Sequence, residues 1–409
     1  MPVRVLVFSS LFPSEARPRH GIMVETRLRN LLRDCPVDAR VIAPVPWFPS
    51  TDRLFGAYAD MAATPRHATR EYGVQVSYPR YLMIPRLGLR LQPQSIARAA
   101  LGDIAALARS GWIPDIIDAH YFYPDGVAAA LLAERLRIPF VITARGTDIN
   151  VLGQMAATAG RIVRAAQSAA EVVAVSPRLK ESLMALGVES SKISVLRNGV
   201  DLDVFAPEDR ARSRQRFGLP DAGRVAACVG NLLPEKGHAL AIESLAHLGD
   251  LQLLLVGDGP TRGALEALAR RLGVEARVRF IPTLPQNELR HVYSSIDVLL
   301  LPSLREGWPS VVLESMACGT PVVATDVGAV GEMVTDPKVG RVVQGRAAPD
   351  FAAAVTEVLL TRTPPEEVRR HAAQFDWGTI SRAQLAIFSR VLGHPSPSRP
   401  NATAALPCV

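Results

Sequence analysis

The stretch PSLREGWPSVVLESMACGTPVVATDVG, residues 302–328, decides the fold of this 409-residue chain. It runs from the end of an apolar, strand-like segment through a loop into a helical pattern. A second apolar strand, PVVAT from Pro321, follows the helix. Strands that alternate with helices are typical of parallel sheets covered by helices on both faces. The stretch therefore predicts an α/β fold.

The same alternation continues from this stretch almost to both ends of the chain. Upstream strand-like segments, such as VRVLVF from Val3, predict one doubly wound domain over residues 1–200. A segment rich in glycine, proline and charge begins at Asn198 and interrupts the pattern, and strands resume at Arg224. We expect three further parts: a second doubly wound domain over residues 201–374, a helix over 375–392 that packs back toward the first domain, and a flexible tail over 393–409.

Composition narrows the class of protein. The chain is 48% hydrophobic and 21% charged, which is typical of a globular protein. Its apolar runs are far shorter than the roughly 18 residues of a membrane-spanning helix. Its N-terminus has no signal-peptide pattern, so we expect an uncleaved cytoplasmic protein. The four cysteines and eight histidines are scattered without metal-type spacing, so we expect neither a bound metal nor a cofactor.

The net charge of +7 favours anionic partners. Charge alone does not choose among anionic small molecules, anionic lipid surfaces and nucleic acid. Arginine dominates the basic residues, and several stand close to the N-terminus. They are Arg17, Arg19, Arg27, Arg29 and Arg33.

Two acids in the opening stretch, Glu306 and Glu314, have seven residues between them. Glu306 falls in the loop and Glu314 about one turn inside the helix, so both can point into the space before the helix N-terminus. Free backbone N–H groups there, from Ser310 to Val312, form a ready diphosphate site. Carboxylates accept hydrogen bonds from vicinal hydroxyls, which suggests a nucleotide sugar. The alternative is that both glutamates are ordinary solvent-exposed residues.

The segment EGWPSVVLE, followed by SMACGTPVVAT, resembles the acid, seven residues, acid signature of retaining glycosyltransferases of family 4. VGNLLPEKG from Val229, LLLVGDGP from Leu253 and NGVD from Asn198 occur in that family's order and spacing. In the first half, IIDAHYFYPDGVAAALLA and VITARGTDIN resemble the branch that builds bacterial surface polysaccharides of the teichuronic-acid type. The resemblance covers about residues 3–390. It implies the GT-B architecture, in which an N-terminal acceptor domain and a C-terminal donor domain, both Rossmann-like, face each other across a cleft.

The resemblance also assigns donor-side roles. Glu314 would bind the donor ribose, Glu306 the hydroxyls of the donated sugar, and Lys236 the diphosphate as it leaves. Many family members carry an arginine where this chain has Asn231, so phosphate binding rests on Lys236 or on another arginine. The other donor-side candidates are backbone positions at strand ends, beside the base or in the turn that would hold the distal phosphate: Gly21, Gly230, Gly257, Leu284, Gly307, Ser310, Val311 and Val312.

His120 ends the predicted strand DIIDAH, and in the resembling family a histidine here lies close to the transferred sugar. Facing the cleft, it could position a hydroxyl or share a proton, with packing as the alternative. It joins Glu306 and Lys236 as a catalytic candidate. The weaker acceptor-side candidates, also at strand ends, are Asp125, Arg145 and Asp148.

Taken with the resemblance, the residues predict a retaining glycosyltransferase. It would move a sugar from a UDP- or GDP-sugar to a saccharide acceptor linked to lipid, in surface polysaccharide or glycolipid synthesis. The N-terminal arginines could hold it to the inner face of the membrane, and we expect no nucleic-acid partner. Two alternatives stay open: a nucleotide-sugar epimerase of the same architecture, and a non-catalytic nucleotide-sugar-binding subunit of a polysaccharide assembly complex.

Overall fold

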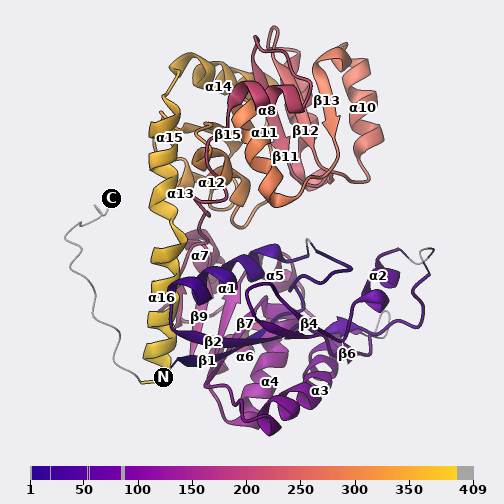
Figure 1. Ribbon diagram of the computed structural model, residues 1–409, viewed down its shortest axis with the longest axis vertical. Coiled ribbons are helices and arrows are strands. Elements are labelled where there is room, and N and C mark those ends of the chain that lie inside the picture. Colours follow the sequence, from indigo (N-terminus) through magenta and orange to yellow (C-terminus); the bar gives the residue numbers. More distant parts are fainter. Residues whose placement is uncertain (1, 19, 53, 55, 84–87, 394–409) are drawn as a thin grey trace, which may run out of the picture.

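The computed structural model describes residues 2–18, 20–52, 54, 56–83 and 88–393, and it consists of two α/β domains stacked along the long axis (Figure 1). Each domain is built around a largely parallel sheet, which confirms the predicted fold class. Most of the expected tail, residues 394–409, lies outside the described residues.

The N-terminal sheet has eight strands, and all neighbours pair parallel except β4 with β5. Its order is β10 (Ile193–Val195), β9 (Glu171–Ala174), β8 (Phe140–Ala144), β7 (Ile116–His120), β1 (Val3–Phe8), β2 (Val37–Ile42), β5 (Gln75–Ser77) and β4 (His67–Thr69). A small parallel pair, β3 (Val45–Pro46) and β6 (Arg80–Tyr81), lies beside it.

Helices cover both faces of this sheet. Along β1, Leu6 and Phe8 join one buried apolar cluster, whereas Val5 and Val7 join another on the opposite face. This alternation follows from the two-residue repeat of a strand. The helices of the domain are α1 (Ile22–Asp34), α2 (Ala57–Ala63), α3 (Gly88–Arg109), α4 (Val127–Leu136), α5 (Thr147–Asn150), α6 (Ala159–Ser168) and α7 (Pro177–Ala185).

The C-terminal sheet is parallel throughout. Its order is β13 (Val278–Ile281), β12 (Gln252–Val256), β11 (Val225–Val229), β14 (Val298–Leu301), β15 (Val322–Thr325) and β16 (Gly340–Val343). Its helices are α8 (Arg210–Arg216), α9 (His238–Leu245), α10 (Arg262–Arg271), α11 (Leu289–Ser295), α12 (Ser310–Ala317), α13 (Val330–Met333), α14 (Ala348–Thr361) and α15 (Pro365–Ala372).

The chain crosses between the domains twice, and the two crossings touch. The second crossing leads into α16 (Trp377–Val391), which returns to the N-terminal domain and packs against α1 (Figure 1). The backbone N–H of Val200 donates to the carbonyl of Phe375 over 3.0 Å. A β-carbon at Gly199 would lie 2.8 Å from the ring of Trp377, so the first crossing has no room for a side chain there.

None of the described helices is both long and apolar enough to cross a membrane. The structure also contains short elements that the sequence pattern did not predict, among them α2, α15 and β16. Helix α3 begins at Gly88, so Pro93 lies inside it and leaves the carbonyl four residues earlier without its helical N–H donor.

Replacing Trp377 by alanine tests how the return helix is held. The side chain is 1% exposed and packs on the first crossing, so we expect Trp377→Ala to lower the free energy of unfolding by about 3–5 kcal/mol. Denaturant unfolding measures the change. Ile113→Ala, at a position 58% exposed, is the control and should change stability by no more than about 0.5 kcal/mol. Equal effects of the two substitutions would contradict the anchoring role.

Candidate active site between the domains

A cavity of about 640 Å³ lies between the domains, at the carboxyl ends of the C-terminal strands. This volume is in the range of small-molecule sites. The N-terminal domain contributes Pro18, Ile22 and Met23, from the loop after β1 and the start of α1. Nine of the predicted donor-side residues line the cavity: Gly230, Asn231, Lys236, Gly257, Leu284, Glu306, Ser310, Val311 and Glu314.

Two glycines let the strand ends of the C-terminal sheet approach each other. Gly257 follows β12 with φ of 148°, and a β-carbon there would lie 2.0 Å from the carbonyl oxygen of Gly230. Gly230 follows β11, and a β-carbon there would meet no atom within 4 Å. The backbone at this end of β11 therefore stands against open space, where a ligand can approach closely.

Glu306 and Lys236 form an ion pair on the cavity wall. The Lys236 Nζ donates to Glu306 Oε1 over 2.7 Å, and Ser303 Oγ donates to the same oxygen over 2.7 Å. Lys236 ends the short turn η5 (Pro234–Lys236), so a strand end and the helix behind it fix its position. Among the described residues that line the cavity, Lys236 is the cation.

Glu314 reaches the cavity from inside α12 and is 6% exposed. Its Oε2 accepts a hydrogen bond from the hydroxyl of Tyr293 over 2.8 Å. Burial raises the pKa of Glu314 to about 7, and hydrogen bonds from Tyr293 and Gln286 oppose this rise. Hydrogen bonds from a polar ligand would act as those of Tyr293 and Gln286 do, against the effect of burial and in favour of the charged carboxylate.

Sequence reasoning missed several residues of the cavity. Trp308 lines it, is 8% exposed, and has an indole nitrogen without a hydrogen-bond partner among the described residues. Its ring lies 6.0 Å from that of Phe375, next to the domain crossing. Gln286 also borders the cavity. Trp308 stands between the two predicted acids, and this position was the signal that could have found it.

The start of α12 is only partly available to a ligand. Ser310 and Val311 line the cavity, and Ser310 Oγ lies 3.4 Å from the sulfur of Met23. The prediction that the N–H group of Val312 is free to bind a phosphate is wrong, because that group already donates to the carbonyl of Pro309 over 3.1 Å. The free N–H groups of the first turn are those before it.

Two predicted glycines make close backbone contacts and do not line the cavity. Gly21, with φ of 69°, begins α1, and a β-carbon there would overlap the carbonyl of Leu11. At Gly307 a β-carbon would lie 2.6 Å from the carbonyl oxygen of Arg145 and 3.5 Å from Gly146 Cα. Gly307 therefore allows the two domains to touch backbone against backbone.

The expectation that His120 faces the cleft is wrong for this conformation, because its side chain is 2% exposed. Its Nε2 lies 3.3 Å from Asp118 Oδ2, and Arg145 Nη2 lies 2.9 Å from its Nδ1. Arg145 also donates to Asn198, which accepts a second hydrogen bond from Arg27. Burial lowers the pKa of His120, so the ring is a neutral member of a buried polar network.

Asp125 and Asp148 are also buried, contrary to their prediction as acceptor-side residues. Asp125 Oδ2 accepts from the backbone N–H of Ser10 over 2.8 Å, and from its hydroxyl over 2.9 Å. Asp148 accepts from the N–H groups of Phe122, Arg145 and Gly146 over 2.8 to 3.0 Å. Both carboxylates accept hydrogen bonds from backbone N–H groups of loops at strand ends. They therefore hold these loops in place from the buried side.

The four N-terminal arginines that the structure describes do not form the free basic face that the sequence suggested. Arg27 is 2% exposed, Arg29 pairs with Asp201, and Arg33 pairs with the neighbouring Asp34. Arg17 lies 2.9 Å from a ring nitrogen of His20. The fifth, Arg19, lies outside the described residues.

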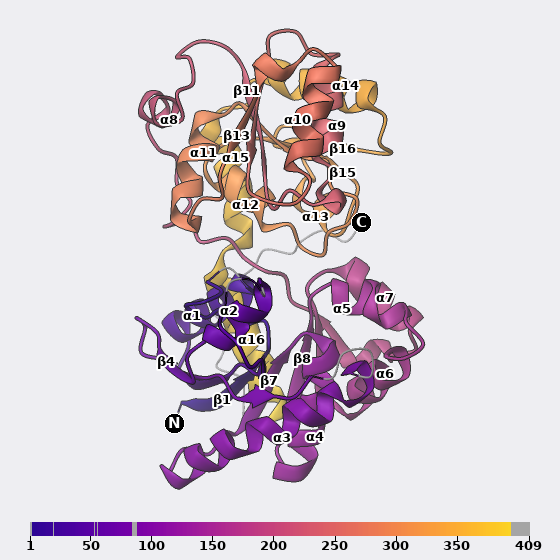
Figure 2. The same cartoon turned by 90° about the vertical axis from the view of Figure 1, so that its right-hand side faces the viewer.

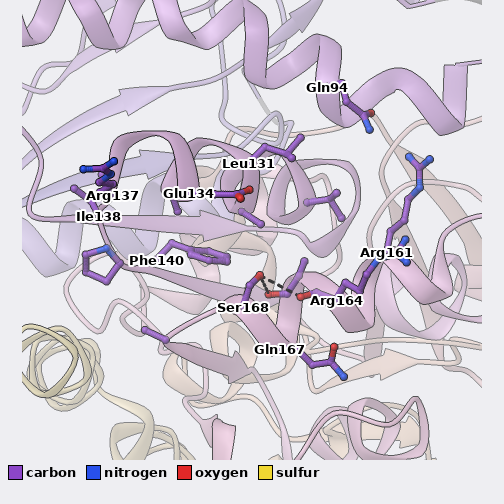
Figure 3. A pocket seen from close by; sticks show the side chains of 16 residues that line it. Gln94, Leu131, Glu134, Arg137, Ile138, Phe140, Arg161, Arg164, Gln167 and Ser168 are labelled. Atoms are coloured by element: carbon purple, nitrogen blue, oxygen red, sulfur yellow. Dashed lines mark hydrogen bonds between the residues drawn. The ribbon is translucent and has the colours of Figure 1, made fainter.

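A larger cavity, of about 1020 Å³, lies away from both acids, between α4 and α6 of the N-terminal domain (Figure 3). Arg161 and Arg164 stand at one end of it and Arg137 at the other. None of the predicted site residues borders this cavity among the described part of the chain. The chemistry predicted from the sequence therefore belongs to the smaller cavity between the domains.

The buried carboxyl of Glu314 should make stability depend on pH. In the unfolded chain it titrates near its ordinary pKa of 4.5, whereas in the folded protein its pKa is about 7. Between these values the folded state holds more protons, so its contribution to stability falls as pH rises. We expect the free energy of unfolding of Glu314→Gln, relative to the wild type, to rise by about 3 kcal/mol from about pH 4 to about pH 8. The exposed Glu134→Gln is the control, and a pH-independent difference for Glu314→Gln would contradict the assignment.

Two family models match the chain: Glycosyl transferases group 1 over residues 209–375, and Glycosyltransferase Family 4 over residues 53–204. TuaC of Bacillus subtilis, whose name assigns it to teichuronic acid biosynthesis, is 30% identical over 392 residues, 93% of this chain and 97% of that protein. The D-inositol 3-phosphate glycosyltransferase of Mycolicibacterium smegmatis is 33% identical over 309 residues, 69% of this chain and 70% of that one.

Solved structures show the same fold. Sucrose-phosphate synthase from Thermosynechococcus elongatus matches with a TM-score of 0.77 at 21% identity, covering 96% of this chain and all of the other. HepE from Anabaena, solved in complex with UDP, matches with a TM-score of 0.70 at 22% identity, covering 95% of this chain and all of the other. The GT-B arrangement of two Rossmann-like domains is confirmed. With TuaC similar over nearly its whole length, this chain belongs to the group 1 and family 4 glycosyltransferases.

Proposed function

We propose that this glycosyltransferase moves a sugar from a nucleotide-sugar donor in the cavity between the domains to a hydroxyl of a lipid-linked saccharide, with retention of anomeric configuration. One observation carries the proposal: the ion pair of Glu306 with Lys236 shares a single cavity with the buried Glu314. A diphosphate needs the cation, and the hydroxyls of a sugar and a ribose need the two carboxylates.

On the donor side, Glu314 and Gln286 would hold the ribose, and the segment from Thr283 to Leu284 would border the base. These residues line the cavity together. We propose UDP-sugars first and GDP-sugars second, since HepE was solved with UDP and also with UDP-glucose. The diphosphate of the donor would bind the ammonium group of Lys236 in place of Glu306. The carboxylate of Glu306 would then accept hydrogen bonds from the hydroxyls of the donated sugar.

In the proposed step the bond between the anomeric carbon and the diphosphate oxygen breaks, and the nucleoside diphosphate leaves with the electron pair. The acceptor oxygen bonds to the same carbon from the same face, and its proton passes to the departing phosphate. Lys236 and the first N–H groups of α12 would stabilise the leaving charge. Because these groups supply positive charge, we propose that transfer needs no metal ion and continues in the presence of a chelator.

The proposals for the acceptor and for the location in the cell rest on the names of relatives. The name of TuaC points to teichuronic acid, so we propose surface polysaccharide synthesis at the cytoplasmic side of the membrane. The names of the two relatives compared favour transfer over epimerisation. The three polar residues brought together in the cavity speak against a non-catalytic subunit.

A screen of UDP-, GDP- and ADP-sugars tests the donor site. We expect one donor class to raise the melting temperature and to be slowly hydrolysed. Lys236→Ala and Glu314→Ala should each remove the thermal shift and lower turnover about 10²-fold or more, because each removes a charged partner of the bound donor. Lys338→Ala, whose side chain is 62% exposed and pairs with Glu367, is the control.

The outcomes of this screen are distinct. If no nucleotide sugar shifts the melting temperature, or the shift survives both substitutions, the donor-site assignment fails. If a donor binds but is not turned over in the presence of acceptor lipids, the protein is a non-catalytic nucleotide-sugar-binding subunit. The anomeric configuration of the product, read by NMR against that of the donor, decides between retention and inversion.

A further inference from the structure

Exposed large apolar side chains gather in one part of the N-terminal domain. Of the thirteen such side chains among the described residues, six lie between residues 47 and 91. Such a gathering departs from the single, scattered apolar residues of an ordinary surface. We call this set the apolar face: Trp47 (51% exposed), Leu54 (89%), Tyr58 (47%), Leu82 (58%), Leu89 (41%) and Leu91 (55%).

The elements that carry the apolar face are joined to one another. β3 pairs with β6, and the hydroxyl of Ser95 in α3 donates to the carbonyl of Leu82 over 2.9 Å. The ring of Phe48 stacks on that of Tyr58 in α2, with centroids 5.1 Å apart. Figure 1 places α2 and β6 at the right-hand edge of the N-terminal domain, and Figure 2 turns that side toward the viewer. The elements that carry the six side chains therefore lie on one side of the molecule (Figure 1, Figure 2).

Two arginines of α3 stand beside this face, Arg90 at the start of the helix and Arg98 near its middle. Arg90 and Arg98 are exposed, and neither forms an ion pair with a carboxylate of the described residues. Arg98 borders a groove of about 510 Å³ between β6 and α3, and Leu82 and Leu91 line the same groove. Apolar side chains and cationic side chains thus share one surface.

The cavity between α4 and α6 continues this surface on the other side of α3. Gln94 of α3 lines both this cavity and the groove beside β6. Arg161, which donates a hydrogen bond to the carbonyl of Arg90, and the exposed Arg164 stand at the end near Gln94 (Figure 3). One acid, Glu134, borders this cavity against three arginines. The surface is therefore basic on both sides of α3.

We propose that the apolar face and its flanking arginines dock this protein on an anionic phospholipid surface. Leucine, tryptophan and tyrosine side chains would enter the boundary between headgroups and acyl chains, and the arginines would bind lipid phosphates. A second copy of the chain is a poorer occupant, because a two-fold contact through this face would set the same arginines against each other.

Docking at the apolar face also bears on how the acceptor reaches the cleft, and this part rests on the proposed function, which supplies the lipid-linked acceptor. The loop after β1 joins this face to the cleft: Ser14 lies 3.4 Å from Thr64, just after α2, and Pro18 of the same loop lines the cavity. A lipid-linked saccharide anchored at the apolar face would therefore have its sugar end near the donor. Vesicle binding is measured without donor, so its failure and that of donor chemistry are distinguishable.

Co-sedimentation of the full chain with vesicles tests the proposal. We expect binding to vesicles of phosphatidylglycerol and phosphatidylcholine, and much less to phosphatidylcholine alone or at high salt. Replacing Leu82, Leu89 and Leu91 together by serine should weaken binding about tenfold or more, since each loses its apolar insertion. Arg90→Glu with Arg98→Glu should remove the preference for anionic vesicles.

The matched control replaces exposed apolar residues elsewhere, Ile113, Leu272 and Leu360, by serine and should bind as the wild type does. Thermal unfolding and donor-induced stabilisation should be unchanged in all three variants, which excludes misfolding as the cause. The proposal is overturned if the wild type sediments with neither vesicle, or if the leucine variant binds as tightly as the wild type. It is also overturned if the wild type is a dimer that the leucine substitutions separate, because the face is then a subunit interface.

Discussion

The geometry of the cleft depends on one contact in which the two domains meet without side chains. At Gly307 a β-carbon would lie 2.6 Å from the carbonyl oxygen of Arg145, too close for any side chain to fit. Asp148 holds that part of the N-terminal loop by accepting hydrogen bonds from the N–H groups of Arg145 and Gly146. A buried carboxylate with no access to the cavity thus fixes where Glu306, next to Gly307, stands.

A second line of contacts joins the cavity to the crossings between the domains. Trp308 borders the cavity and packs on Phe375, whose carbonyl accepts the N–H of Val200 at the other crossing. Trp377 fills the space that Gly199 leaves open. The cavity wall at Trp308 is therefore packed directly against the segment where the chain crosses between the domains.

The sequence predicted the α/β class and the parallel sheets well, because apolar strands and helical patterns alternate so regularly. The residues predicted that Glu306 and Glu314 would face one site, and the family resemblance added Lys236 to it; all three line one cavity. The sequence could not show which way a strand-end side chain turns. His120 and Asp125 stand at such ends but face inward, because the loops around them need buried hydrogen-bond partners. The basic face expected from the N-terminal arginines fails at Arg27 for a similar reason: Arg27 looks like a surface residue of a helix, yet it is buried and donates to Gln384 of the distant α16.

The ion pair between Lys236 and Glu306 bears on the end of the catalytic cycle. In the proposed reaction the departing nucleoside diphosphate no longer carries the sugar hydroxyls that would occupy Glu306. The carboxylate then competes with the diphosphate for the same ammonium group. Product release would be assisted by the protein's own internal anion, which takes back the cation that the spent donor had held.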